Sequence, residues 1–412
     1  MNSIALNYRP GFYERAILGA LQQMPLGSLD LILPGGQKLS LGNGEGNIRA
    51  DVTIKDPDFF RRAFLYGDIG FGEAYTDGLW ETSNITEVIR WFLLNIDQAP
   101  SVSGSRSKTF ALNILRFFNR IYHRKRSNSL SGSRKNISEH YDLHNDFFAL
   151  FLDPTMTYSS AYFNKDNMSL EEAQLAKYER LASRLNLKSS DHVLEIGSGW
   201  GGNAIFMAQT YGCRVTSITI SEEQYKLAKE RVAEAGLSNR VSIELADYRL
   251  IEGSFDKIVS IEMLEAVGHD FLELFFKRCH ELLKKGGVLA LQVITCPDSR
   301  YDSLRKGVDW IQKHIFPGTL LPSVAAINRA INNTSDLSLV NLKDIGLHYS
   351  RTLGIWQQRF NKRLDEVKKL GFDDEFIRKW NYYFSYCDAA FSMRNIYVMQ
   401  MVYSRPNNSN LT

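Results

Sequence analysis

The fold of this chain is decided by residues 191–206, which read DHVLEIGSGWGGNAIF. The apolar run Val193–Ile196 predicts a buried strand, and the spacing of apolar residues after Gly201 predicts a helix. Between them, residues 197–202 (GSGWGG) satisfy the pattern G-x-G-x-x-G. In this strand–turn–helix context, glycines let a nucleotide lie against the backbone at the carboxyl edge of a parallel sheet. The stretch therefore predicts a nucleoside-binding turn, with a plain tight turn as the alternative.

Strand and helix signals alternate around this turn. Alternation of this length predicts an α/β fold with a doubly wound, mostly parallel, Rossmann-like sheet. Further strands are expected at Arg214–Thr219, Val241–Leu245, Lys257–Ile261 and Val288–Ile294, and helices at Gly201–Thr210, Ser221–Ala235 and Phe271–Lys285.

Two nucleoside cofactors fit the turn, a dinucleotide and S-adenosylmethionine. Glu195 precedes the turn inside a strand, where a buried carboxylate needs a partner because an unpaired buried charge is costly. The amino group of S-adenosylmethionine supplies that partner, directly or through water, whereas a pyrophosphate would be repelled. Thr219 also stands where a dinucleotide site usually has a ribose-binding carboxylate. These residues favour S-adenosylmethionine and a methyltransferase.

Shifts in composition divide the chain into three segments. Residues 1–97 predict a small N-terminal α+β domain, and residues 139–412 the catalytic domain. Residues 98–138 contain Lys and Arg but no Asp or Glu, which predicts a basic linker. Within it, Phe110–Arg126 has the spacing of an amphipathic helix, which either packs on a neighbouring domain or lies on an anionic membrane surface.

Inside the N-terminal segment, alternating apolar residues predict strands at Ser28–Leu33 and Arg49–Ile54. A helical stripe runs through Glu81–Asn95 behind an N-cap signal. The intervening stretch 67–80, GDIGFGEAYTDGLW, is predicted not to be helical because it is dense in glycine.

Bulk composition excludes several classes of protein. The chain has 412 residues and a net charge of +3, so the sequence gives no reason to expect a nucleic-acid partner. Its four cysteines are scattered, and neither a metal site nor a disulfide framework is expected. No signal peptide or run long enough to span a bilayer is evident. These observations favour a cytoplasmic protein.

Several separate blocks of the chain, in order, resemble the cyclopropane-fatty-acyl-phospholipid synthase family of class I S-adenosylmethionine-dependent methyltransferases. The resemblance runs from about residue 139 to residue 406. Its blocks are EHYDLHNDFFALFLDPTMTYSSAYF (139–163), VLEIGSGWGG (193–202), VTSITISEEQ (215–224), DYR (247–249), EMLEAVG (262–268), IFPGTLLPS (315–323), HYSRTLGIWQQRF (348–360) and AAFSMRNIYVMQMVYSR (389–405).

The resemblance implies a set of cofactor-binding residues. Tyr158 and Ser159 would lie over the cofactor, and the residues at 195–199 at its methionine and ribose end. The others would lie along the adenosine or near the adenine. The full set is Tyr158, Ser159, Glu195, Gly197, Gly199, Thr219, Ile220, Gln224, Asp247 and Tyr248.

The family adds a methyl group to a cis double bond of a phospholipid acyl chain, and a base then removes a proton from the new methyl so that a cyclopropane ring closes. In the family the base is a bound bicarbonate. Of its ligands, this chain keeps Glu265 and Tyr349, whereas Ser160 stands at the cysteine position and Gln292 at the histidine position. Because Gln carries no positive charge, bicarbonate binding should be weaker.

Two products stay open at this point. Either bicarbonate still binds and the ring closes, which we favour, or the proton is lost elsewhere and the product is methyl-branched. A methyltransferase for a small polar acceptor and a non-catalytic binding module are the remaining alternatives.

The implied substrate is an unsaturated phospholipid in a bilayer, so the protein is expected at the inner membrane surface, docked peripherally through the basic residues 106–135. Residues 308–317, VDWIQKHIFP, are expected to form part of a helical lid that either lines an acyl tunnel or packs on its own core. The resemblance also allows a homodimer through the first domain.

Overall fold

The computed structural model describes residues 10–96 and 144–408, which divide into two compact units. The described part of the first unit comprises residues 10–96 together with Gly307–Trp310 and Phe372–Met393. The rest of the described chain forms the second unit. The three-segment division made from the sequence stays a prediction, and its linker helix at Phe110–Arg126 lies outside the described residues.

The first unit contains a four-stranded sheet with the order β2-β1-β3-β4. Strand β1 is antiparallel to β2 and parallel to β3, and β4 closes the other edge antiparallel to β3. The predicted strands at 28–33 and 49–54 and the helix within 81–95 are confirmed. The bounds are α1 Phe12–Leu21, β1 Ser28–Ile32, β2 Lys38–Leu41, β3 Arg49–Ile54, α2 Asp58–Thr76, β4 Trp80–Glu81, α3 Ile85–Leu94 and α16 Asp374–Ser392.

The prediction that residues 67–80 are not helical is wrong for most of that stretch, because α2 continues to Thr76. The helix is kinked at Gly67, whose φ of 59° lies in the region that glycine tolerates. Further along, a Cβ on Gly70 would lie 2.2 Å from the backbone oxygen of Arg62, and one on Gly72 would lie 2.5 Å from the Trp310 ring. These two glycines are therefore explained by close packing around a bent helix.

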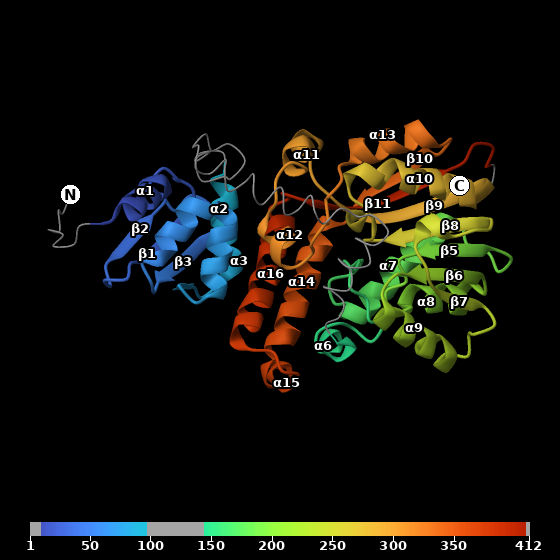
Figure 1. Cartoon of the computed structure of the whole chain (residues 1–412), viewed down its shortest axis with the longest axis horizontal. Coiled ribbons are helices and arrows are strands. Elements are labelled where there is room, and N and C mark those ends of the chain that lie inside the picture. Colours follow the sequence, from blue (N-terminus) through green and yellow to red (C-terminus); the bar gives the residue numbers. More distant parts are fainter. Residues whose placement is uncertain (1–9, 97–143, 409–412) are drawn as a thin grey trace. The chain divides into compact units, whose positions relative to one another are not determined.

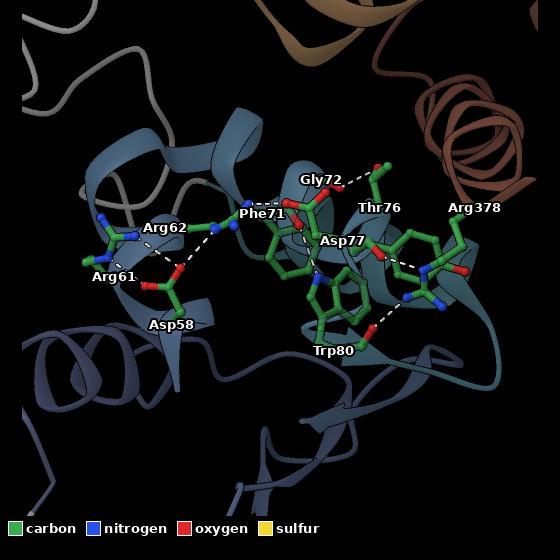
Figure 2. A network of polar contacts seen from close by, with 10 residues as sticks. Asp58, Arg61, Arg62, Phe71, Gly72, Thr76, Asp77, Trp80 and Arg378 are labelled. Atoms are coloured by element: carbon green, nitrogen blue, oxygen red, sulfur yellow. Dashed lines mark hydrogen bonds and ion pairs between the residues drawn. The ribbon is translucent and has the colours of Figure 1, made fainter. Parts of the chain in front are cut away.

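Polar contacts fix both ends of this bent helix (Figure 2). Near its start, Asp58 pairs with Arg61 and Arg62, with N···O distances of 2.6 and 3.0 Å. Near its end, Arg378 of α16 donates to the backbone oxygens of Tyr75 and Trp80 at 2.6 and 2.9 Å. The carboxyl end of α2 is thereby tied to strand β4 and to α16 within the same unit.

The second unit is built around a seven-stranded sheet with the order β10-β11-β9-β8-β5-β6-β7 (Figure 1). Strands β5 to β9 are parallel, whereas β11 is antiparallel to both of its neighbours. The bounds are β5 His192–Ile196, β6 Arg214–Thr219, β7 Val241–Leu245, β8 Phe255–Ile261, β9 Leu283–Thr295, β10 Ser338–Asp344 and β11 Tyr397–Ser404. The chain runs outward from β5 through β6 to β7 and resumes on the other side at β8, so the strand order reverses between β5 and β8.

Alternate residues of the strands enter two separate cores. In β5, Leu194 and Ile196 belong to a core with helices α10 and α13, whereas Val193 belongs to a core with α7, α8 and α9. Helices therefore cover both faces, and the predicted doubly wound α/β fold is confirmed. These helices are α7 Leu170–Leu185, α8 Gly202–Tyr211, α9 Glu222–Glu234, α10 Leu272–Leu282 and α13 Val324–Thr334.

The predicted helix at 271–285 is three residues too long. Leu283 pairs with Phe255 of β8, so residues 283–285 already belong to β9. The remaining helices of this unit are α6 Asn145–Ala149, α11 Asp298–Leu304, α12 Trp310–His314 (whose first residue belongs to the first unit), α14 Gly346–Asn361 and α15 Leu364–Lys369. Helices α11 to α13 form an insertion between β9 and β10, where the lid was expected.

No helix within residues 10–96 and 144–408 is both long enough and apolar enough to cross a bilayer.

Candidate active site

The glycine turn follows β5 directly, at the point where the strand order reverses. Gly197, Gly199 and Gly201 have φ values of 97°, 49° and 84°, which side chains rarely adopt. A Cβ on Gly199 would meet nothing within 4 Å, whereas one on Gly202 would lie 2.6 Å from the backbone oxygen of Thr155. The turn is thus open to a ligand at Gly199, whereas Gly202 is needed for packing. Crevices for ligands form at such reversal points in open α/β sheets.

Glu195, the last residue but one of β5, is 2% exposed. Its carboxylate accepts a hydrogen bond of 2.7 Å from the Asn203 amide and another from the Ser217 hydroxyl. Burial raises the pKa of this carboxyl to about 7, although both hydrogen bonds and the charge of Lys177 lower it. From the sequence we expected Glu195 to need a partner from outside the chain. The structure supplies neutral partners within the chain, so Glu195 no longer distinguishes between the two cofactors, although its buried carboxyl can still ionise beside a cation.

The residues predicted along the adenosine lie at the carboxyl end of β6. The Thr219 hydroxyl donates to the Gln224 side-chain oxygen at 2.8 Å and accepts from the Ser221 amide at 3.1 Å. Ser221 in turn caps α9 by accepting from the Gln224 backbone N–H. Ile220 is half-buried between them. The capping sequence therefore explains locally why these side chains meet at this edge of the sheet.

Asp247 and Tyr248, predicted near the adenine, follow β7. The Asp247 carboxylate is 3% exposed, pairs with Arg249 at 2.6 Å and accepts from the Arg249 backbone N–H at 3.0 Å. The half-buried Tyr248 ring packs edge-to-face on Phe275, with 5.3 Å between centroids. Both residues lie at the same sheet edge as the glycine turn, and Asp247 already has a cationic partner.

A wall of aromatic rings surrounds Tyr158, which precedes Ser159. The centroid of the Tyr158 ring lies 5.3 Å from those of Phe148 and Trp356 and 6.3 Å from that of Phe316. Phe316 comes from the insertion between β9 and β10. The predicted lid therefore contributes one ring to this wall.

The other bulky residue of that insertion behaves differently. Trp310 is fully buried in the first unit, where its ring lies 4.6 Å from that of Tyr382. Its packing there fits the expectation that this part of the insertion packs on a core.

Three of the four predicted catalytic residues converge on a carboxylate that the sequence argument did not single out, that of Glu262. The Ser160 backbone N–H and the Gln292 side-chain amide donate to Glu262 Oε1 at 2.9 and 2.8 Å. The Tyr349 side chain also hydrogen-bonds to Glu262. The Ser160 hydroxyl does not take part, because it donates to the backbone oxygen of Ala161.

Each of these donors is held by its own element. Gln292 lies within β9, inside the strand expected at Val288–Ile294, and its side-chain oxygen accepts from Gln400 of β11 at 2.9 Å. Tyr349 projects from α14, which is tied to the segment around Ser160 because the Ala161 backbone N–H donates to the Thr352 hydroxyl at 3.1 Å. The site is therefore assembled from a loop, two strands and a helix.

Glu265, the fourth predicted catalytic residue, lies one turn beyond Glu262 and is 6% exposed. One carboxylate oxygen accepts from the Ile294 backbone N–H, while no donor among the described residues reaches Oε2. Burial, and then the neighbouring charge of Glu262, raise the pKa of Glu265 to about 8. Glu265 is thus protonated at neutral pH and can donate a hydrogen bond.

A buried lysine was also missed from the sequence. Lys177 of α7 has no exposed surface and donates to the Ser159 hydroxyl at 2.7 Å. Burial lowers its pKa to about 7, against the attraction of Glu262, Asp153 and Glu195. In the sequence, Lys177 looks like any surface lysine of an amphipathic helix. Glu262 gave a weak signal, since EMLEAVG contains two acidic residues.

Comparisons with known proteins show the family to which the chain belongs. The family model described as mycolic acid cyclopropane synthetase matches residues 128–401. The tuberculostearic acid methyltransferase UfaA1 of Mycobacterium tuberculosis is 40% identical over 349 residues, which cover 82% of this chain and 80% of the relative. The cyclopropane-fatty-acyl-phospholipid synthase of Escherichia coli K12 is 38% identical over 365 residues, which cover 87% and 89%.

Solved structures agree as well. The cyclopropane synthase MmaA2 of Mycobacterium tuberculosis superposes with a TM-score of 0.62 at 30% identity, covering 66% of this chain and 98% of its own. The mycolic acid cyclopropane synthase CmaA1, in complex with SAH and CTAB, gives 0.61 at 29% identity, covering 66% and 98%. The chain belongs to the cyclopropane synthase family of S-adenosylmethionine-dependent methyltransferases.

Proposed function

We propose that this enzyme adds the methyl carbon of S-adenosylmethionine to a cis double bond in an acyl chain of an unsaturated phospholipid, and that loss of a proton from the added methyl closes a cyclopropane ring. The observation that carries the proposal is the position of two carboxyl groups, Glu262 and Glu265, at the sheet edge that also holds the glycine turn. The E. coli relative, a cyclopropane-fatty-acyl-phospholipid synthase, supports the choice of substrate.

The cofactor residues are assigned on the same basis. The glycine turn at Gly197 and Gly199, which is open at Gly199, would receive the cofactor, with the Glu195 carboxyl facing its ammonium group. Thr219 and Gln224 would lie along the adenosine, and Asp247 near the adenine. S-adenosylmethionine supplies an electrophilic methyl group when it is bound.

The protein's part in the chemistry follows from the difficulty of the reaction. An alkene is a weak nucleophile, so holding it in line with the methyl group offsets much of the barrier. Methyl transfer leaves a carbocation on the acyl chain, and electron-rich rings such as those of Tyr158 and Trp356 stabilise a cation at their faces. A carboxylate beside these rings would then take the proton that must leave before the ring can close.

The lipid substrate implies contact with a bilayer, which we assign to the basic residues 106–135. Their attraction to anionic lipids should be screened by salt. Binding to anionic vesicles is therefore expected to weaken as salt is added, and binding that is indifferent to salt would exclude this assignment.

The function is tested with vesicles of cis-unsaturated phospholipid and S-adenosylmethionine carrying a trideuterated methyl group. Mass spectrometry of the released fatty acids counts the deuterons kept in the product. Two deuterons are expected, since ring closure removes one. Three would indicate a methyl branch, and cofactor binding without any labelled lipid would favour a small polar acceptor instead.

A further inference from the structure

We infer that the carboxylate of Glu262 is the anion of this active site and accepts the proton from the added methyl group, in place of a bound bicarbonate. The inference rests on the proposed function for its chemistry. Its structural part, that a side chain of the protein fills the anion position, stands on the contacts of Glu262 alone.

The first observation is the set of donors around Glu262. The donors expected to hold bicarbonate were Ser160, Gln292 and Tyr349. All three hydrogen-bond to the Glu262 carboxylate, Ser160 through its backbone N–H. Hydrogen bonds to an ionised group are the stronger kind, and three of them on one carboxylate favour its charged form. Burial opposes this and raises the pKa of Glu262 overall, but the donors are in either case already satisfied by a carboxyl group that belongs to the chain.

The second observation is the backbone of Glu262. It has a φ of 48°, a conformation that costs energy for any residue other than glycine. Its N–H is fixed by the backbone oxygen of Gln292 at 2.7 Å. A long side chain in this strained position needs a compensating interaction, and the three donors provide one. The chain thus carries a carboxylate at a place where glycine would be the easier residue.

The third observation is the location. Glu262 directly follows β8, which is paired with β5 in a register that aligns Val259 with Glu195. A Cβ on Gly197 would lie 3.2 Å from the side chain of Met263, the residue next to Glu262. The carboxylate therefore lies at the reversal point of the sheet, beside the glycine turn. Glu262 is half-buried as a residue, whereas Glu265 is buried.

Bicarbonate does not fit this arrangement. An additional anion would need donors, and those of Ser160, Gln292 and Tyr349 are engaged. It would also lie against the Glu262 carboxylate, and two anions in close contact disfavour each other's ionised form. Burial raises the pKa of Glu262, while the neighbouring charge of Lys177 and the three hydrogen bonds act against that rise.

The proposed reaction consists of methyl transfer followed by proton loss with ring closure. The π electrons of the double bond form a bond to the methyl carbon while the sulfur–carbon bond breaks and its electron pair stays on sulfur. A carbocation remains on the other alkene carbon. One C–H bond of the new methyl then breaks, its electron pair closes the ring, and the proton passes to Glu262. The neutral Glu262 finally releases that proton to water.

The test compares the wild type with Glu262→Gln, in the trideuterated assay described above. Glutamine keeps an oxygen that can accept from Ser160 and Gln292 but does not take up a proton. We expect the two-deuteron product to fall by about 10²- to 10⁴-fold, the usual contribution of a general base, with unchanged affinity for S-adenosylmethionine. Glu252→Gln, at an exposed carboxylate, is the matched control. A Glu262→Gln variant that still forms the ring at the wild-type rate would overturn the proton-transfer role.

A second measurement does not depend on turnover. Titration with ¹³C-labelled bicarbonate, followed by NMR line broadening, should show saturable binding by Glu262→Gly and none by the wild type. Added bicarbonate should also restore ring formation to Glu262→Gly, while its removal leaves the wild-type rate unchanged within twofold. Saturable binding by the wild type, or none by Glu262→Gly, would refute the inference. If the wild type binds its cofactor but labels no lipid, the proposed substrate fails, and this titration still decides whether Glu262 fills the anion position.

Discussion

The substitution Glu195→Gln tests the electrostatics of the cofactor end of the site. Glutamine has the same shape as the glutamate and can keep both hydrogen bonds, because the Ser217 hydroxyl can turn to accept from the new amide. The variant removes only the ionisation. Since burial raises the pKa of Glu195 from an ordinary 4.5 to about 7, the folded protein without its cofactor holds this proton more tightly than the unfolded chain does.

The sign of the effect follows from that difference. A carboxyl whose pKa is raised on folding contributes stability that is fully present below pH 4.5 and is lost as the pH rises through about 7. Integrated between pH 5.5 and pH 8.5, the loss is about 2 kcal/mol, since each pKa unit is worth about 1.4 kcal/mol. The wild type should lose this amount over the interval and Glu195→Gln should not.

Thermal unfolding of both proteins at pH 5.5, 7 and 8.5, without cofactor, measures the difference. For a unit of this size, about 2 kcal/mol corresponds to roughly 5 °C in the midpoint of the catalytic unit. Glu195→Gln should therefore gain roughly that much on the wild type between the two extremes, while Glu252→Gln should follow the wild type. Parallel curves for Glu195→Gln and the wild type would show that the buried carboxyl is ionised throughout, and the reasoning would be wrong.

Three further predictions concern the same unit. Binding of S-adenosylmethionine at pH 6 should release about one proton, because the ammonium group of the cofactor favours the ionised form of Glu195. Calorimetry in two buffers of different ionisation enthalpy measures this release, and a binding heat that does not depend on the buffer would contradict the prediction. Gly202→Ala should lower the free energy of unfolding by about 1–3 kcal/mol, because its Cβ would meet a backbone oxygen at 2.6 Å. The control Gly354→Ala, in an uncrowded helical position, should raise it by about 0.5–1 kcal/mol in the same urea titration. Lys177→Met removes the positive charge that lowers the pKa of Glu262, so the acid limb of the pH profile of kcat/KM should move to higher pH; an unmoved limb would mean that Lys177 and Glu262 do not set it.

Much of the fold could be predicted because each strand of the large sheet is indicated by a short, continuous stretch of sequence. The runs Val193–Ile196 and Arg214–Thr219 are rich in β-branched residues and are buried over almost their whole length, and they are found at the expected residues. Helix α2 could not be predicted in the same way. Gly70 and Gly72 lower helix propensity locally, and what requires them is contact with Arg62 and Trp310, of which the second is more than 200 residues away in the chain.

The residues around the site could be predicted from the sequence, but the carboxylate that they surround, Glu262, could not. The resemblance supplied Ser160, Gln292 and Tyr349, and the structure brings them together. It did not supply the group on which they converge, because nothing in the letters EMLEAVG shows that Glu262 has a positive φ or that it faces donors from three other elements. A hydrogen-bonded centre assembled from residues 30 to 102 positions apart leaves no local pattern to read.

The inferred role of Glu262 gives a physical reason for Gln292 at the position where the resemblance implies a histidine. A free anion has to be drawn from solution, which favours a charged ligand at the histidine position. A carboxylate attached to the backbone is held at that position by the chain itself, so a neutral donor is sufficient. What the neutral donor needs is a fixed orientation, because an amide that turned over would present its oxygen to the carboxylate. Gln400 prevents this by donating to the Gln292 oxygen at 2.9 Å, and Arg180 fixes Gln400 in turn at 2.7 Å. On this inference, the neutral Gln292 is sufficient because the anion it binds is the side chain of Glu262, which the backbone already holds in place.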